Sequence, residues 1–134
     1  MRSNPADAVI LLGDLNDGPE AATTQVLYGP PGSQPATRGF VRQDRGDDVR
    51  LFNLAPFIPA ERRYSRINHG VKELIDHILV SARCLPVGDE TRSTPVVDVR
   101  ADLQGGIESV ASDPNVRRGK VGSDHAPVVA EVEV

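Results

Sequence analysis

The segment at residues 74–80 (LIDHILV) is apolar except for two adjacent polar side chains, Asp76 and His77. A short apolar run of this kind predicts a buried strand, in which neighbouring side chains point to opposite faces. An ionised carboxylate is costly to bury unless it has a partner. Asp76 therefore needs either a partner from elsewhere in the chain or a place on an edge strand. For His77, which points the other way, packing or surface exposure is the simpler interpretation.

A second apolar run, residues 8–12, stops at a glycine and also predicts a buried strand. A proline and a glutamate at positions 19 and 20 then favour a helix that ends near Tyr28. Asp14 and Asn16 therefore fall on a strand-to-helix loop. Strand alternation predicts that their side chains point the same way. The alternative is an Asx-turn that only caps the following helix.

The other segments predict further strands joined by loops. We expect a hairpin formed by residues 63–67 and 73–81, strands at residues 95–99 and from residue 128 onward, a short helix at residues 49–54, and loops at residues 29–50 and 102–122. Strands outnumber helices, and helices fall between some of the strands, so the expected class is α/β or α+β. The length fits one domain, residues 1–134.

Composition narrows the kinds of site that this chain can build. Cys84 is the sole cysteine, which excludes an internal disulfide and a zinc site made of several cysteines. The net charge of −4 argues against broad coating of nucleic acid. No apolar run reaches the length that predicts a transmembrane segment, roughly 20 residues. The start of the sequence has no signal-peptide pattern, but we leave the cellular location undecided.

A third polar motif lies at the entry to the last predicted strand, where Ser123, Asp124 and His125 are adjacent. This motif places a carboxylate that can bind a metal beside an imidazole. The imidazole would be cationic if a second carboxylate held it. The alternative is a capped turn with His125 exposed to solvent.

The ordered set of residues 13–16 (GDLN), 75–78 (IDHI) and 123–128 (SDHAPV) resembles the C-terminal half of the endonuclease/exonuclease/phosphatase superfamily, which includes nucleases similar to deoxyribonuclease I. Tyr64 and Ser65, before the predicted hairpin turn, resemble it too. The resemblance implies half of a four-layer α/β/β/α sandwich, with a mainly antiparallel mixed sheet and flanking helices. Residues 1–134 would then form the C-terminal half of one such domain.

The resemblance also implies a role for each site residue. Asp14 would position or deprotonate the attacking water, and Asn16 would contact the scissile phosphate. His125 would donate to a phosphoryl oxygen, and Asp76 would pair with the imidazole and keep it protonated. Asp124 would lie on or near a metal ion. Magnesium is the expected ion because hard cations prefer oxygen ligands, with manganese or calcium as alternatives.

Two family motifs, an Asn and the main metal-ligating Glu on earlier strands, find no match in this sequence. We therefore expect weak metal binding, little or no activity of the isolated chain, and an exposed sheet face. That face would favour self-association or pairing with a separate N-terminal half. The substrate, a nucleic acid, a phospholipid or a small phosphate ester, stays open. The alternatives are a non-catalytic half-domain that binds a partner, and an unrelated small α/β domain with chance motifs.

Overall fold

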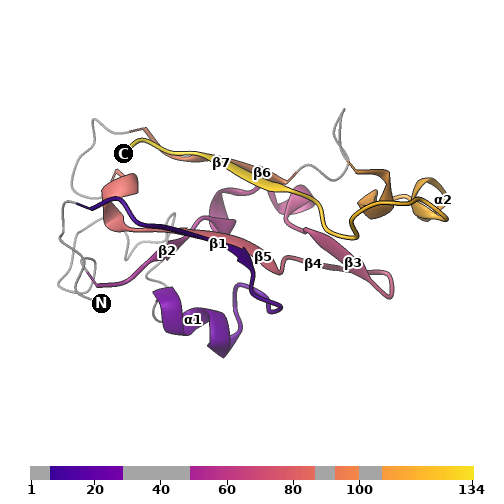
Figure 1. The fold of residues 1–134 in the computed structure, drawn as a ribbon, viewed down its shortest axis with the longest axis horizontal. Coiled ribbons are helices and arrows are strands. Elements are labelled where there is room, and N and C mark those ends of the chain that lie inside the picture. Colours follow the sequence, from indigo (N-terminus) through magenta and orange to yellow (C-terminus); the bar gives the residue numbers. More distant parts are fainter. Residues whose placement is uncertain (1–6, 29–48, 87–92, 100–106) are drawn as a thin grey trace.

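The computed structural model describes residues 7–28, 49–86, 93–99 and 107–134 (Figure 1). Its strands are β1 (Ile10–Asp14), β2 (Phe52–Asn53), β3 (Arg66–Asn68), β4 (Val71–Glu73), β5 (Asp76–Val80), β6 (Val96–Val99) and β7 (Val128–Glu131). Its helices are α1 (Ala22–Tyr28) and α2 (Pro114–Arg117), with short 3-10 turns at Ala55–Phe57, Ala60–Arg62, Ala82–Cys84 and Glu108–Val110. The loops that we expect at residues 29–48 and 102–106 lie outside the described residues.

The arrangement is of the α+β kind, with antiparallel sheets and few helices. β5 is the middle strand of a three-stranded sheet, in the order β1-β5-β2. The other two pairs are the β3–β4 hairpin and β6–β7, and all the pairs are antiparallel. In Figure 1, α1 lies below the three-stranded sheet and β6–β7 lies above it. None of the helices in the described ranges has the length and apolarity to cross a membrane.

The hydrophobic core lies around β5, as the apolar run at residues 74–80 predicts. Leu79 and Val80 are fully buried, because β5 is paired on both edges and other segments pack against it. The buried cluster also contains residues from β2, from β6 and from the 3-10 turns and the residues that flank them, namely Phe52, Leu54, Ile58, Tyr64, Leu85, Val97, Val99 and Val110. His77 is buried as well, at 2% exposure, so packing is the correct interpretation for this side chain.

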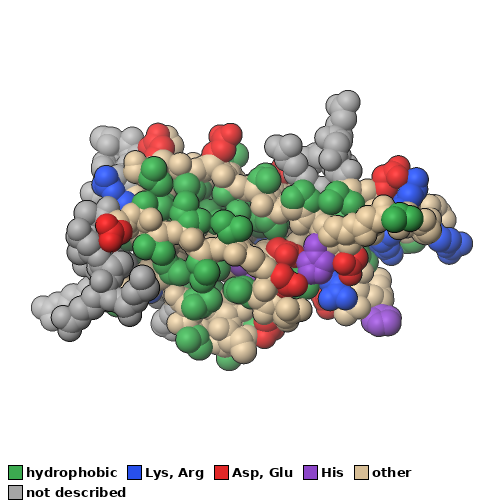
Figure 2. Space-filling view, in the orientation of Figure 1, with side chains coloured by type: hydrophobic (Ala, Val, Ile, Leu, Met, Phe, Trp, Pro, Cys, Tyr) green, Lys and Arg blue, Asp and Glu red, His purple; other side chains and the backbone are tan. Residues whose placement is uncertain are grey.

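The prediction that the first apolar run is buried proves wrong. Ile10, Leu11 and Leu12 form part of β1, but 45%, 39% and 68% of their surfaces are exposed. An edge position alone does not explain this exposure, since β2 at the other edge of the same sheet is buried. The reason is that the described residues pack little against β1 apart from β5. Figure 2 shows hydrophobic side chains gathered over β1 and the β6–β7 pair. The sheet therefore presents an apolar face to solvent at β1.

The helix predicted at residues 49–54 is also wrong. Phe52 and Asn53 form β2, and the backbone N–H of Leu54 donates to the carbonyl of Ile78 at 2.9 Å. Pairing with β5 outweighs the local helix preference because it buries Phe52 and Leu54 in the core. The helix expected from position 19 begins instead at Ala22.

The predicted hairpin is confirmed for its first strand and its turn, but its second strand divides in two. Residues His69 and Gly70 form the turn, with φ angles of 47° and 85°. Positive φ at both positions is the signature of a two-residue type I′ turn. β4 ends at Glu73, and β5 then joins a different sheet.

Strands at residues 95–99 and from residue 128 onward are confirmed as β6 and β7. The described part of the loop predicted at residues 102–122 differs, since it contains α2. This helix is capped by Asp113, whose carboxylate accepts from the N–H of Asn115 at 2.8 Å.

Candidate active site

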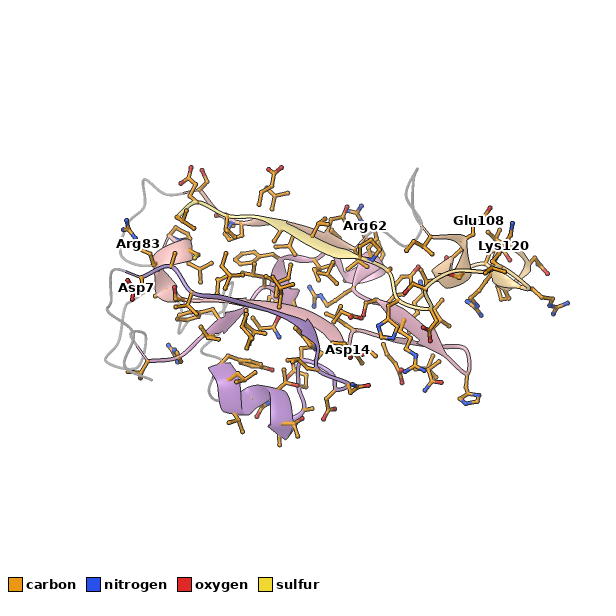
Figure 3. All side chains as sticks on the ribbon, in the orientation of Figure 1. Asp7, Asp14, Arg62, Arg83, Glu108 and Lys120 are labelled. Atoms are coloured by element: carbon orange, nitrogen blue, oxygen red, sulfur yellow. The ribbon has the colours of Figure 1, made fainter. Side chains whose placement is uncertain are left out.

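Asp14 and Asp76 lie opposite each other on neighbouring strands. Asp14 ends β1 and Asp76 begins β5, and the antiparallel register pairs the two residues directly. In the same ladder Leu12 lies opposite Ile78 and Gly13 opposite His77. Directly opposed residues in an antiparallel pair project to the same face, with Cβ atoms about 5 Å apart. The two carboxylates therefore meet at one end of the sheet, where Figure 3 labels Asp14.

His125 reaches the same place from the distant end of the sequence. Its Nδ1 lies 2.8 Å from Oδ2 of Asp76, and each side chain is about one-fifth exposed. The turn before β7 is indeed capped, since the Ser123 hydroxyl accepts from the N–H of His125 at 3.0 Å. The cap nevertheless coexists with a ring that is paired to a carboxylate. His125 is therefore the partner that a carboxylate in a core strand requires.

Backbone pairing with the segment before β3 holds His125 in place. Arg66 and His125 form an isolated antiparallel bridge, and the N–H of Ala126 donates to the Ser65 carbonyl at 2.7 Å. The hydroxyl of Ser65, which is fully buried, accepts from the N–H groups of Ile75 and Asp76 at 3.3 and 3.2 Å. Ser65 thus joins the start of β5 to the segment that carries His125.

Three side chains that could each supply a metal ligand come together at this point. An oxygen of Asp14, an oxygen of Asp76 and a ring nitrogen of His125 all lie within 4.8 Å of one another. The carboxylate of Asp14 is exposed, whereas the other two groups are half-buried. Figure 2 shows acidic side chains and a histidine clustered beside the hydrophobic face. The cluster combines a solvent-accessible base with an imidazole that is held by a carboxylate.

The sequence of this chain matches a family model. The model described as the Endonuclease/Exonuclease/phosphatase family matches residues 1–125 of the 134-residue chain. The chain belongs to the endonuclease/exonuclease/phosphatase family. Neither the comparison with curated proteins nor the comparison with solved structures found a match. Family membership points to phosphoester hydrolysis as the chemistry of this site.

Asn16 lies beside the cluster, but alternation is the wrong guide to its side chain. β1 ends at Asp14, and Asn16 adopts a positive φ of 54°. Its N–H donates to Oδ1 of Asp14 at 2.8 Å, so the predicted Asx-turn is present. That turn lies well before α1, and it uses only one oxygen of the carboxylate. Asn16 faces a polar hollow of about 590 Å³ that Arg66 and Lys72 also line.

Asp124 lies outside the three-residue cluster. Its carboxylate is 3.6 Å from Nε of Arg66, and its side chain is 75% exposed. The family role that the sequence suggests for Asp124, on or near the metal, therefore stays a prediction. Of the five expected site residues, Asp14, Asp76 and His125 come together, and the other two border them.

An apolar-sided hollow of about 380 Å³ adjoins the cluster on its second flank. Asp76 and His125 line it together with Leu12, Ser123 and Pro127. The cluster therefore borders this hollow through Asp76 and His125, whereas the polar hollow is lined by Asn16 and not by the cluster residues themselves.

The donor set suits a hard divalent cation of the kind that this family typically uses. Carboxylate oxygens are the ligands that such ions prefer, and Asp14 offers an exposed one. Asp76 shares its Oδ2 with His125, which leaves Oδ1 for a cation. The residues present therefore fit a metal ion through Asp14 and Asp76, although two carboxylates are a small ligand set.

Sequence patterns gave no hint of Asn53, a fully buried side chain beside His77. Ser65 was singled out only by the family resemblance. Both residues have short polar side chains next to apolar runs, and that pattern also occurs at ordinary strand ends. Only their hydrogen bonds in the folded chain reveal which segments they connect.

Proposed function

We propose that this chain hydrolyses a phosphate ester, a phosphodiester or a phosphomonoester, with a divalent cation. The observation that supports this function best is the 2.8 Å pair between His125 and Asp76, with Asp14 directly across the sheet from Asp76. A carboxylate that can accept a proton thus lies beside an imidazole that can donate one. Hydrolysis of a phosphate ester uses both groups in one step.

Each residue has a defined part in this proposal. Asp14 orients the attacking water and accepts its proton, because its carboxylate is exposed and accessible. His125 donates from Nε2 to a phosphoryl oxygen, since its Nδ1 is engaged by Asp76. Asp76 fixes the ring orientation and stabilises the imidazolium form. Asn16 contacts the phosphate from the polar hollow that it lines.

Magnesium is the cation that we propose, with manganese or calcium as substitutes. The carboxylates of Asp14 and Asp76 would hold it, and Asp124 is the next candidate. When bound, a divalent cation neutralises charge on the phosphate and on the group that leaves. Because the described residues bring only two carboxylates to the cluster, we propose weak metal binding and weak turnover for the chain on its own.

A second candidate function is favoured by the exposed apolar face of β1. In this alternative the chain is a half-domain that binds a partner and does no catalysis. We propose that the face is covered in use, either by a second copy of this chain or by a separate N-terminal half. The second arrangement would complete the four-layer α/β/β/α sandwich typical of the family. Exposed patches of this kind mark interaction surfaces.

The rate of hydrolysis of bis(4-nitrophenyl) phosphate, measured over a range of magnesium concentrations, distinguishes the catalytic function from the partner-binding function. We expect slow turnover that requires the cation and is lost in Asp14→Ala. The control Glu61→Ala removes an exposed carboxylate far from the cluster in sequence and should leave the rate unchanged. Equal rates for the two variants would contradict the catalytic proposal.

Sedimentation of the purified chain tests the partner-binding candidate. If β1 forms a contact between copies, the chain should dimerise at high concentration and Leu12→Asp should weaken the association. Val121→Asp is the matched control, because Val121 is also an exposed aliphatic residue but lies outside the β-sheets. A chain that stays monomeric at all concentrations excludes self-association through β1.

A further inference from the structure

Next to Asp76 in the sequence lies a second histidine that the proposed chemistry does not use. His77 is 2% exposed, and both of its ring nitrogens are hydrogen-bonded. Nδ1 lies 3.2 Å from Nδ2 of Asn53, and Nε2 lies 2.8 Å from the carbonyl oxygen of Asp17. Buried polar atoms are normally hydrogen-bonded, so what matters here is which segments the two partners belong to. The contacts connect β5, β2 and the turn that follows β1.

The proton positions in this set follow from its partners. Oδ1 of Asn53 accepts from the backbone N–H of Ala55 at 2.9 Å, so the Asn53 amide must turn its NH₂ group toward the ring. Nδ1 of His77 is then an acceptor and carries no proton. The carbonyl of Asp17 can only accept, so Nε2 must carry the proton. These partners assign the Nε2–H tautomer to His77.

His125 has the opposite arrangement. Its Nδ1 faces a carboxylate, which can only accept while it is ionised, so Nδ1 carries a proton. Two histidines that sit 2.8 Å from their respective oxygen partners thus use different ring nitrogens as donors. This difference in tautomer is measurable. It distinguishes His77, which is bonded to a backbone carbonyl, from His125, which is bonded to a carboxylate.

The carbonyl held by His77 belongs to the turn that carries the site. The turn leaves β1 at Asp14 and passes through Asn16, whose backbone is left-handed. Beyond it, the carboxylate of Asp17 accepts from the N–H of Gly18 at 3.1 Å and from the hydroxyl of Thr23 on α1. Across the turn, the bond from the N–H of Leu15 to the carbonyl of Ile75 is 2.8 Å. His77 is the side chain that ties the far end of this turn to the buried sheet.

We propose that His77 and Asn53 form a buried hydrogen-bonded relay that positions the turn at residues 14–17, and through it the carboxylate of Asp14. They are positioning residues: neither needs to touch substrate or metal. Only the activity part of this inference rests on the proposed function, because the tautomers and the order of the turn can be measured without turnover.

Nitrogen-15 spectra of the histidine side chains test the tautomers in the full chain. His77 should show a protonated Nε2 and a bare Nδ1, whereas His69, which is exposed at the hairpin turn, should show averaged signals. His69→Gln and His77→Gln assign the signals by deletion. A bare Nε2 on His77, or an averaged pattern like that of His69, would overturn the relay.

Hydrogen exchange tests the positioning. In His77→Leu, exchange of the amides of Leu15, Asn16 and Gly18 should quicken by about tenfold or more, whereas that of Val97 and Val99 in β6 should stay unchanged. His77→Gln keeps an N–H that can reach the carbonyl of Asp17, so it should restore slow exchange. Where turnover is measurable, kcat should fall in His77→Leu and recover in His77→Gln, with little change in KM.

Two results would contradict the proposal. One is faster exchange spread evenly over the whole chain, which would make His77 a general stabiliser. The other is slow exchange in the turn despite the loss of both ring nitrogens. If His77→Leu fails to fold, Asn53→Leu supplies the same test, because it removes the partner that fixes the ring. A chain that shows the relay but no turnover would refute the proposed function and leave this inference standing.

Discussion

Nδ1 of His125 lies 2.8 Å from Oδ2 of Asp76, although 49 residues separate the two in the sequence. Neither residue would be remarkable alone, since an aspartate on a strand and a histidine after a turn are both common. Their pairing gives a core-strand carboxylate its partner and gives an imidazole a fixed orientation. In an unrelated domain whose motifs arose by chance, this hydrogen bond would not be expected.

Breaking this pair should reduce activity more than stability. In Asp76→Asn the ring loses the carboxylate that accepts from its Nδ1 and fixes its orientation, so kcat/KM should fall by about 10²-fold or more. His125→Gln should cause a similar loss, and the double variant should lose little more than either single one. Steady-state kinetics on a phosphodiester, with circular dichroism as the control for folding, measures this. Additive losses would show that the two residues act separately.

The metal should depend on Asp14 more than on Asp124. Asp14 belongs to the cluster of three donor groups, whereas Asp124 is paired with Arg66 and largely exposed. We expect calorimetric titration with magnesium to show a clear loss of affinity in Asp14→Asn and a smaller one in Asp124→Asn. Addition of EDTA should abolish turnover in the unmodified chain. The reverse order of the two variants would restore Asp124 as the main ligand.

Ser65→Ala should disturb the pair between His125 and Asp76 without touching either residue. The substitution leaves the buried N–H groups of Ile75 and Asp76 without their acceptor, at a cost of about 1–3 kcal/mol. Ser81 at the other end of β5 is the matched control, since its hydroxyl also accepts from a backbone N–H, that of Val9, at 3.0 Å.

The measurement is the Nδ1–H resonance of His125 together with urea unfolding. Both serine variants should be less stable than the unmodified chain. Only Ser65→Ala should shift or broaden the His125 signal. An equal effect of Ser81→Ala on that signal would mean that Ser65 has no special connection to the site.

Leu79→Ala and Leu12→Ala should differ sharply in their effects on folding. Leu79 is fully buried in the middle strand, so its truncation should lower the free energy of unfolding by about 2–5 kcal/mol. Leu12 is 68% exposed on the edge strand, and its truncation should change the free energy by about 0.5 kcal/mol or less. Urea unfolding at low protein concentration compares them. A large loss for Leu12→Ala would show that β1 is covered in solution.

The apolar runs in the sequence predicted three of the strands correctly. β5, β6 and β7 were located because their apolar residues pack in the core or pair with a neighbour. A different signal, a capping aspartate at position 48 and a proline at position 56, predicted a helix at residues 49–54, where β2 lies instead. A segment that short has no periodicity strong enough to compete with the pairing that the rest of the chain offers it.

The sequence by itself indicated which residues are candidates for the chemistry, because carboxylates, an amide and an imidazole beside apolar runs are recognisable without coordinates. It also predicted a hairpin turn at residues 68–70, which the structure narrows to His69 and Gly70 because Asn68 pairs with Val71. Only the tertiary structure decided which of these residues meet. The antiparallel register brings Asp14 to Asp76, the bridge between Arg66 and His125 brings the imidazole, and Asp124 turns toward Arg66 instead. Contacts between distant segments depend on how the whole chain packs, and no local pattern records that.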